Sequence, residues 1–242
     1  MPSQRYVSPE LTHFVGKRLS CEDQQDQQYS LLVDDILKAG WLMHPPFDRP
    51  PREGLSEGTP LVGGTPTPGV DDTEAAYWQG ICFCDIPVTD LEIHMNKYSR
   101  FGLSFRKLFL RDKGANPVLY VAKNSQALAF GLPGTHTGYD VWTRDKVFKG
   151  NRRLYEDHRQ KLPLTLNYFL DMLVFAFIKY FDDSASDEDE ANVYMEREWR
   201  VLGDVNFTLA DVYRVFMPER YAERFRADLP DYKGQLTFSD NI

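Results

Sequence analysis

The segment Glu196-Arg197-Glu198-Trp199-Arg200-Val201-Leu202 contains the residues whose types and spacing best suit chemistry. It leads into a predicted strand, and in an extended chain residues i and i+2 point to the same side. Glu196 and Glu198 would therefore face one site, with Trp199 and Val201 turned the other way. Two like charges aimed at one point repel each other, so stability alone would not place them there. The pair is either a catalytic site or the solubilising charge of an exposed strand edge.

The composition predicts a large core and an acidic surface. The 242 residues are 42% hydrophobic, which is enough for one large domain, and the net charge is −8. An acidic surface repels phosphate backbones, so we do not expect non-specific binding to nucleic acid. Three cysteines form no spaced disulfide framework, no signal peptide is visible, and the apolar stretch 162–181 is interrupted by Pro163, Asn167, Asp171 and Lys179. We therefore expect a cytoplasmic protein without a membrane span.

The hydrophobic pattern predicts strands and helices that intermix without a regular alternation. Strands are expected at 10–15, 81–84, 101–105, 117–122, 194–203 and 212–217, and an extended segment begins at 41–43. Helices are expected at 26–39, from Pro87 to about Tyr98 with Asp85 as its cap, as a pair within 151–181, and at 218–228. The absence of a βαβ rhythm favours the α+β class over a doubly wound sheet. No internal repeat or domain boundary is visible, so a single domain over 1–242 is expected.

Two segments are predicted to be long loops. Residues 44–72 contain seven prolines and five glycines, which predicts either a lid ordered by a ligand or a tolerated surface insertion. Residues 182–190 contain six acidic residues in nine, which predicts a solvated loop.

Other candidate residues allow two interpretations each. Cys82 and Cys84 are close together, but no second Cys or His pair lies at a zinc-finger distance, so buried strand cysteines are favoured over a metal site. His13, inside an apolar strand, is either a core histidine or a ligand-binding one. His94 and Tyr98, at i and i+4 of a helix, share a face for packing or for binding.

The order of these motifs along the chain resembles known families. LTHF followed by DDILKAGWL, and later EREWRVLGDVNFTLADVYRVFMPERYAERF, resemble the DarT-type branch of the ADP-ribosyltransferase fold. CFCDIP, HMNKYSRFGLSF, NPVLYV and EREWR together resemble the AbiGi family of abortive-infection phage-resistance proteins, which are described as antitoxins. The resemblance to that family spans nearly the whole chain. Together they imply an ADP-ribosyltransferase-like split β-sheet core with surrounding helices.

The transferase resemblance implies a site that binds NAD and transfers ADP-ribose to a macromolecular target. Breaking the bond between nicotinamide and ribose gives an oxocarbenium-like transition state, which nearby negative charge stabilises. Glu198 matches the catalytic carboxylate, and Glu196 matches the acid that prepares the acceptor in some branches. His13 matches the histidine that binds a ribose hydroxyl, with Thr12 beside it. NAD would be the substrate, and no metal is implied.

Phe83 or Tyr98 would supply an aromatic wall for nicotinamide. The sequence departs from better-known members, because it has no clear Ser-Thr-Ser triplet and because its acidic loop before Glu198 would favour a basic protein target over DNA. An alternative function is therefore a non-catalytic antitoxin or immunity protein that binds a cognate toxin. A third is a module that binds NAD without consuming it.

Overall fold

The computed structural model describes residues 8–16, 24–43, 80–122, 175–182, 184–186, 189 and 192–242. The strands are β1 Glu10–Phe14, β2 Trp41–Leu42, β3 Gly80–Cys84, β4 Gly102–Arg106, β5 Asn116–Pro117, β6 Leu119–Ala122, β7 Ile178–Phe181, β8 Glu198–Leu202, β9 Val205–Asn206, β10 Val212–Met217 and β11 Gln235–Phe238. The α-helices are α1 Gln25–Ser30, α2 Glu92–Lys97, α3 Lys107–Asp112 and α6 Ala222–Asp228. The π-helix η3 spans Leu31–Leu37, and the 3₁₀ segments are η4 Val88–Asp90, η8 Phe175–Phe177, η9 Val193–Glu196, η10 Glu219–Tyr221 and η11 Ser239–Asn241. The predicted α+β class is confirmed.

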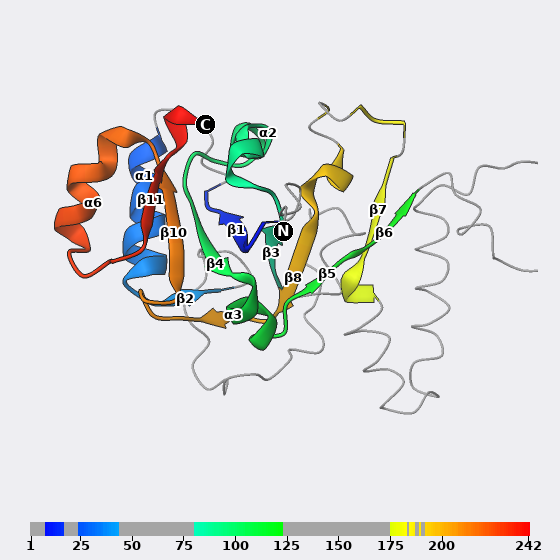
Figure 1. Cartoon of the computed structure of the whole chain (residues 1–242), viewed down its shortest axis with the longest axis horizontal. Coiled ribbons are helices and arrows are strands. Elements are labelled where there is room, and N and C mark those ends of the chain that lie inside the picture. The colour runs from blue at the N-terminus through cyan, green and yellow to red at the C-terminus, as the bar shows by residue number, and fades with distance from the viewer. Residues whose placement is uncertain are drawn as a thin grey trace, which may run out of the picture. The chain divides into compact units, whose positions relative to one another are not determined.

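The described residues fall into two compact units. The first holds those up to Pro117 and from Glu196 onward, and the second holds those from Val118 to Met195. In the first unit, a seven-stranded sheet of described residues has the order β11-β10-β4-β1-β3-β8-β5 (Figure 1). All neighbouring strands in it are antiparallel except β10 and β11. In the second unit β6 and β7 form a parallel pair.

One face of the large sheet is apolar and forms the main core. Alternate strand residues such as Leu11, Phe83 and Phe105 are buried in one cluster with Ile36 of η3 and Phe225 of α6. Period-2 alternation in the strands and helical spacing in 25–37 together explain this packing, because each pattern directs its apolar residues to one side. The predicted helix at 26–39 is confirmed, but its second half is π-helical, with the Lys38 amide bonded to the Val33 carbonyl at 2.9 Å.

The opposite face of the sheet carries polar side chains. Thr12, Cys84 and Glu198 are partners in register across β1, β3 and β8. Ser104 pairs with Thr12 on one side and with Arg214 of β10 on the other. Partners in register across antiparallel strands project to the same face. A smaller cluster that includes Leu91 and Met95, at the start of and within α2, packs over this polar face.

Several predicted element boundaries are wrong. The strand expected at 117–122 is two short strands, because Pro117 has no N–H to continue the ladder, and the chain passes from β5 into β6 of the second unit. Residues 178–181 lie in strand β7 instead of a helix, since pairing with β6 overrides the local pattern. Asp85 does not cap the following helix: it accepts bonds from the Ser8 amide at 3.2 Å and the Lys107 ammonium at 2.7 Å.

Most residues of the two predicted loops lie outside the described ranges. Residues 44–72 lie outside the described residues, as do 151–174. Of 182–190, the structure describes 182, 184–186 and 189, where short turns close, with the Asp189 amide bonded to the Ser186 carbonyl at 3.1 Å. Within the described ranges, none of the helices has the length and apolar character that a membrane span needs.

Candidate functional site

Glu196 and Glu198 are not alternate residues of one strand. Glu196 ends the 3₁₀ segment η9, and β8 begins only at Glu198. Between them Arg197 has a φ of 45°, in the left-handed region that non-glycine residues rarely adopt. Its carbonyl accepts a bond from the Asp85 amide at 3.2 Å, which continues the contact with β3. The strand predicted at 194–203 is therefore wrong over its first residues, and the i, i+2 argument does not apply to Glu196.

Glu198 lies in a buried ion pair. Its Oε1 is 2.6 Å from Nε of Arg200, and both side chains are almost fully buried. The thiol of Cys82, on the neighbouring strand, donates to the same oxygen at 2.9 Å. Arg200 is two residues from Glu198 in the same strand, and it pairs in register with Cys82. Strand alternation therefore places all three side chains on the polar face.

Glu196 has partners of its own. Lys97 at the end of α2 places its ammonium 2.6 Å from Oε1, and the hydroxyl of Tyr98 donates to the same atom. Burial is the main reason why the pKa of Tyr98 lies above its usual value, and the charges of Glu196 and Glu198 add to it. Tyr98 is therefore a protonated donor near both carboxylates.

Burial also raises the pKa of the Cys84 thiol, and the charge of Glu196 contributes. Since a thiol reacts as a thiolate, Cys84 is held in its unreactive form. The two glutamates thus lie near a common set of side chains, although local chain geometry is not what brings them together.

Cys82 contacts both His13 and Glu198. Its carbonyl is 2.8 Å from Nδ1 of His13, and its thiol bonds Glu198. The register nevertheless places His13 on the face opposite Glu198, where its ring lies 5.7 Å from that of Phe83. The residue in line with Glu198 is Thr12, whose hydroxyl is buried without a hydrogen-bond partner among the described residues. Of the two predicted ribose-binding residues, Thr12 shares the face of the carboxylates and His13 does not.

The two predicted aromatic residues also separate. Phe83 belongs to the apolar core, with only 2% of its surface exposed. Tyr98 lies beside Glu196, and its ring stacks at 6.5 Å on His94 and at 6.3 Å on Phe14. His94 and Tyr98 share a face, as predicted, and of Phe83 and Tyr98 it is Tyr98 that faces the carboxylates.

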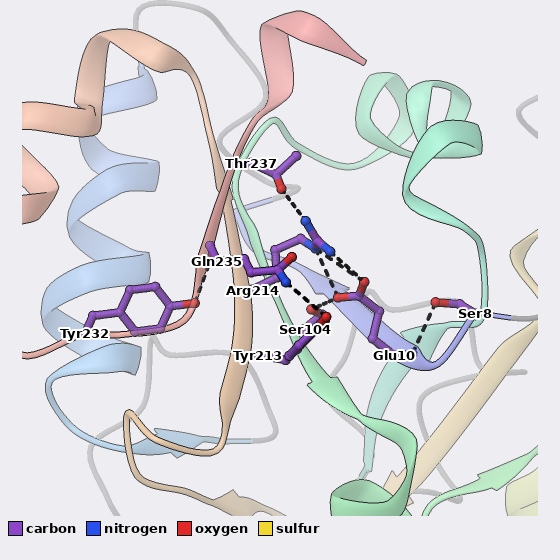
Figure 2. A network of polar contacts seen from close by, with 8 residues as sticks. All are labelled: Ser8, Glu10, Ser104, Tyr213, Arg214, Tyr232, Gln235 and Thr237. Carbon is purple, nitrogen blue, oxygen red and sulfur yellow. Dashed lines mark hydrogen bonds and ion pairs between the residues drawn. The ribbon is translucent and has the colours of Figure 1, made fainter.

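A second charged network lies on the same polar face (Figure 2). Glu10 of β1 accepts bonds from the guanidinium of Arg214 at 3.1–3.3 Å and from the hydroxyl of Ser104. Arg214 also donates to Thr237 of β11 at 2.7 Å. The network connects four strands, β1, β4, β10 and β11. Sequence analysis did not single it out, because its members are far apart in the chain.

The described residues contain no group of three His, Cys, Asp or Glu side chains placed to hold a metal ion. What the face does hold is carboxylates compensated by cations: Glu198 by Arg200, Glu196 by Lys97 and Glu10 by Arg214. Sequence analysis missed these three cations. Arg200 could have been found from its i+2 spacing to Glu198, whereas Lys97 and Arg214 have no such local signal.

Fold and site together define a mixed α+β protein whose large sheet has one apolar and one ion-paired face. Residues 73–235 match the family model described as "Putative abortive phage resistance protein AbiGi, antitoxin", and since the match covers more than half of the chain, the protein belongs to the AbiGi family. No curated protein and no solved structure matches the chain.

Proposed function

We propose that the protein is the antitoxin of an abortive-infection system and that it acts by binding a cognate toxin, without catalysis. The family description supports this role. The structural observation that carries the non-catalytic part is the burial of both candidate carboxylates in ion pairs, Glu198 with Arg200 and Glu196 with Lys97.

The chemistry expected of Glu198 needs an uncompensated negative charge that faces a ligand. At 2.6 Å, the Arg200 guanidinium offsets that charge, and Glu198 has only 3% of its surface exposed. Both residues lie in strand β8, and removing one member of a buried ion pair is strongly destabilising. Glu198 is therefore a structural residue in this proposal.

Co-expression with toxins taken from the genes that flank its own tests the proposal. The wild-type protein should restore growth to cells that express its cognate toxin. A Glu198→Gln/Arg200→Gln variant removes both charges together, and it should restore growth equally well wherever circular dichroism shows that it is folded. Growth rescue by the wild type that is lost in the folded variant would show that the carboxylate has a direct role.

We propose NAD-dependent ADP-ribosyl transfer as a second candidate, motivated by one observation. Thr12 is only 1% exposed, and its buried hydroxyl has no hydrogen-bond partner among the described residues, which is costly unless a ligand or water supplies one. A ribose hydroxyl at this point of the sheet would lie on the face of Glu198 and Tyr98. The Glu198 carboxylate would then have to release the Arg200 guanidinium and face the oxocarbenium-like ribose of the transition state.

Incubation of the purified protein with NAD and cell lysate tests this candidate. Nicotinamide release and labelled product, both lost in the Glu198→Gln variant, would support transfer. Binding of NAD in calorimetry without nicotinamide release would favour the sensing function instead. If folded protein shows no NAD binding and no nicotinamide release, the transferase and sensing functions are both refuted and the antitoxin function is the one that stands.

A further inference from the structure

Strand β11 forms one edge of the large sheet. Its inner side pairs in parallel with β10, from Gln235 opposite Arg214 to Phe238 opposite Met217. Among the described residues no strand pairs with its outer side, where an edge strand carries backbone groups that can bond another chain. Figure 1 shows this strand, in red, at the end of the sheet that carries α6, in orange.

A groove lies directly beside this edge. Its cavity volume is about 460 Å³, and its apolar lining comes from Phe225 and Leu229 of the α6 segment and from Leu236 and Phe238 of β11. Leu236 and Phe238 are alternate residues, in register with Val215 and Met217 of the apolar core. A strand added to β11 would therefore direct every second side chain over the groove.

Two cations complete the lining. Arg226 and Lys233 are exposed, and in the described part of the chain neither has a carboxylate partner. The Lys233 ammonium donates only to the Pro230 carbonyl, at 3.1 Å. Two cations without carboxylate partners in the lining of this partly apolar groove favour an occupant that carries negative charge beside them.

We propose that β11 and the α6 groove bind an extended segment of the cognate toxin that alternates apolar and acidic residues and adds to the sheet as an eighth strand. The apolar side chains fill the groove, and a carboxylate meets Arg226 or Lys233. The identity of the occupant rests on the proposed antitoxin function; the surface and its chemistry do not.

The direct test uses a synthetic octapeptide of alternating valine and glutamate, with an alternating valine and lysine octapeptide as the opposite-charge control. Fluorescence anisotropy should show at least tenfold tighter binding of the acidic peptide. The variant Arg226→Glu/Lys233→Glu should weaken it at least tenfold. The matched variant Arg111→Glu/Lys113→Glu changes two exposed residues, one in α3 and one directly after it; it has the same change in charge and should stay within about twofold.

Hydrogen exchange locates the contact: the acidic peptide should slow exchange of the amides of Gln235–Phe238. Equal binding to both variants, protection elsewhere, or no binding up to the solubility limit of the peptide would overturn the proposal. So would a concentration-dependent dimer whose β11 amides are protected without peptide, because the occupant would then be a second copy of the chain.

Growth rescue separates this proposal from the antitoxin function. If the wild type neutralises its toxin and the Arg226→Glu/Lys233→Glu variant does so equally well, the β11 surface is refuted and the antitoxin function stands. If no flanking toxin is neutralised but the acidic peptide binds at β11, the surface stands and the antitoxin function is refuted.

Discussion

Replacing Arg200 by methionine tests whether the buried Glu198–Arg200 pair of strand β8 stabilises the fold. Both side chains are buried, with 6% of Arg200 and 4% of Glu198 exposed, and the pair is 2.6 Å long. Methionine replaces the apolar stem of arginine with an unbranched apolar chain and removes the charge. The variant removes the guanidinium beside Glu198, whose carboxylate also accepts a bond from the Cys82 thiol at 2.9 Å.

The expected loss follows from Coulomb's law. At an effective dielectric constant of about 20, unit charges about 4 Å apart attract each other by roughly 4 kcal/mol. Breaking one side of a buried pair costs about 3–5 kcal/mol in measured cases. For a protein of this size each kcal/mol lowers Tm by about 2–4 °C, so Arg200→Met should lower Tm by roughly 6–20 °C.

Chemical denaturation of a double-mutant cycle measures the pair. The variant Glu198→Leu/Arg200→Met, which removes both charges, should be within about 1 kcal/mol of wild type or more stable than it. Arg111→Met is the matched control, because Arg111 pairs with Asp112 at 3.1 Å on the surface and should change stability by less than about 0.5 kcal/mol. If Arg200→Met is no more destabilising than Arg111→Met, or if the single losses simply add in the double variant, the structural role is refuted.

Three further variants or conditions test separate parts of the fold. Thr12→Val removes the buried hydroxyl that has no partner among the described residues, so denaturant unfolding should show a gain of about 1 kcal/mol; a loss would reveal a hidden partner. Gly40→Ala should lower the free energy of unfolding, measured with denaturant, by at least about 1 kcal/mol more than Gly114→Ala does. Both glycines have positive φ, which costs alanine about 1–2 kcal/mol. Of the two, only Gly40 lies where a Cβ would meet a backbone oxygen, that of Phe207 at 2.7 Å. Equal losses would contradict that contact. The raised pKa of Tyr98 predicts alkaline unfolding: stability is fully present below about pH 10, where the unfolded phenol ionises, and falls as the pH rises towards the folded pKa. Absorbance at 295 nm should show part of the tyrosine signal changing together with unfolding, and reversible ionisation of every tyrosine near pH 10 in folded protein would contradict this.

The sequence predicted the strands of the main sheet well because their pattern is local. Alternating apolar residues located β1, β3, β4 and β10 to within a residue or two, and helical spacing located α1 with η3. Predictions failed where distant partners decide the outcome. Residues 178–181 become a strand because β6 lies beside them, and β11 forms because β10 offers an edge.

In the candidate site, too, the residues were predicted from local sequence, whereas their contacts depend on distant partners. Glu196 and Tyr98 were each singled out from the sequence, yet nothing in it indicated that the Tyr98 hydroxyl would bond a carboxylate 98 positions away. Pairing of β3 with β8 makes that contact possible. The i+2 spacing indicates that Arg200 shares a face with Glu198, but it did not lead to the prediction that Arg200 offsets the charge of Glu198.

By itself the sequence determined the α+β class and the family-specific motifs. It also determined that Glu198 projects from a strand on the face of Arg200, because backbone geometry relates the directions of neighbouring side chains. Only the tertiary structure decided that Glu196 leaves that strand, that Thr12 and not His13 shares the face of Glu198, and that Lys97 compensates Glu196. These outcomes depend on which strands pair and in what register, and a charge is compensated or free according to neighbours that the fold brings from far along the chain.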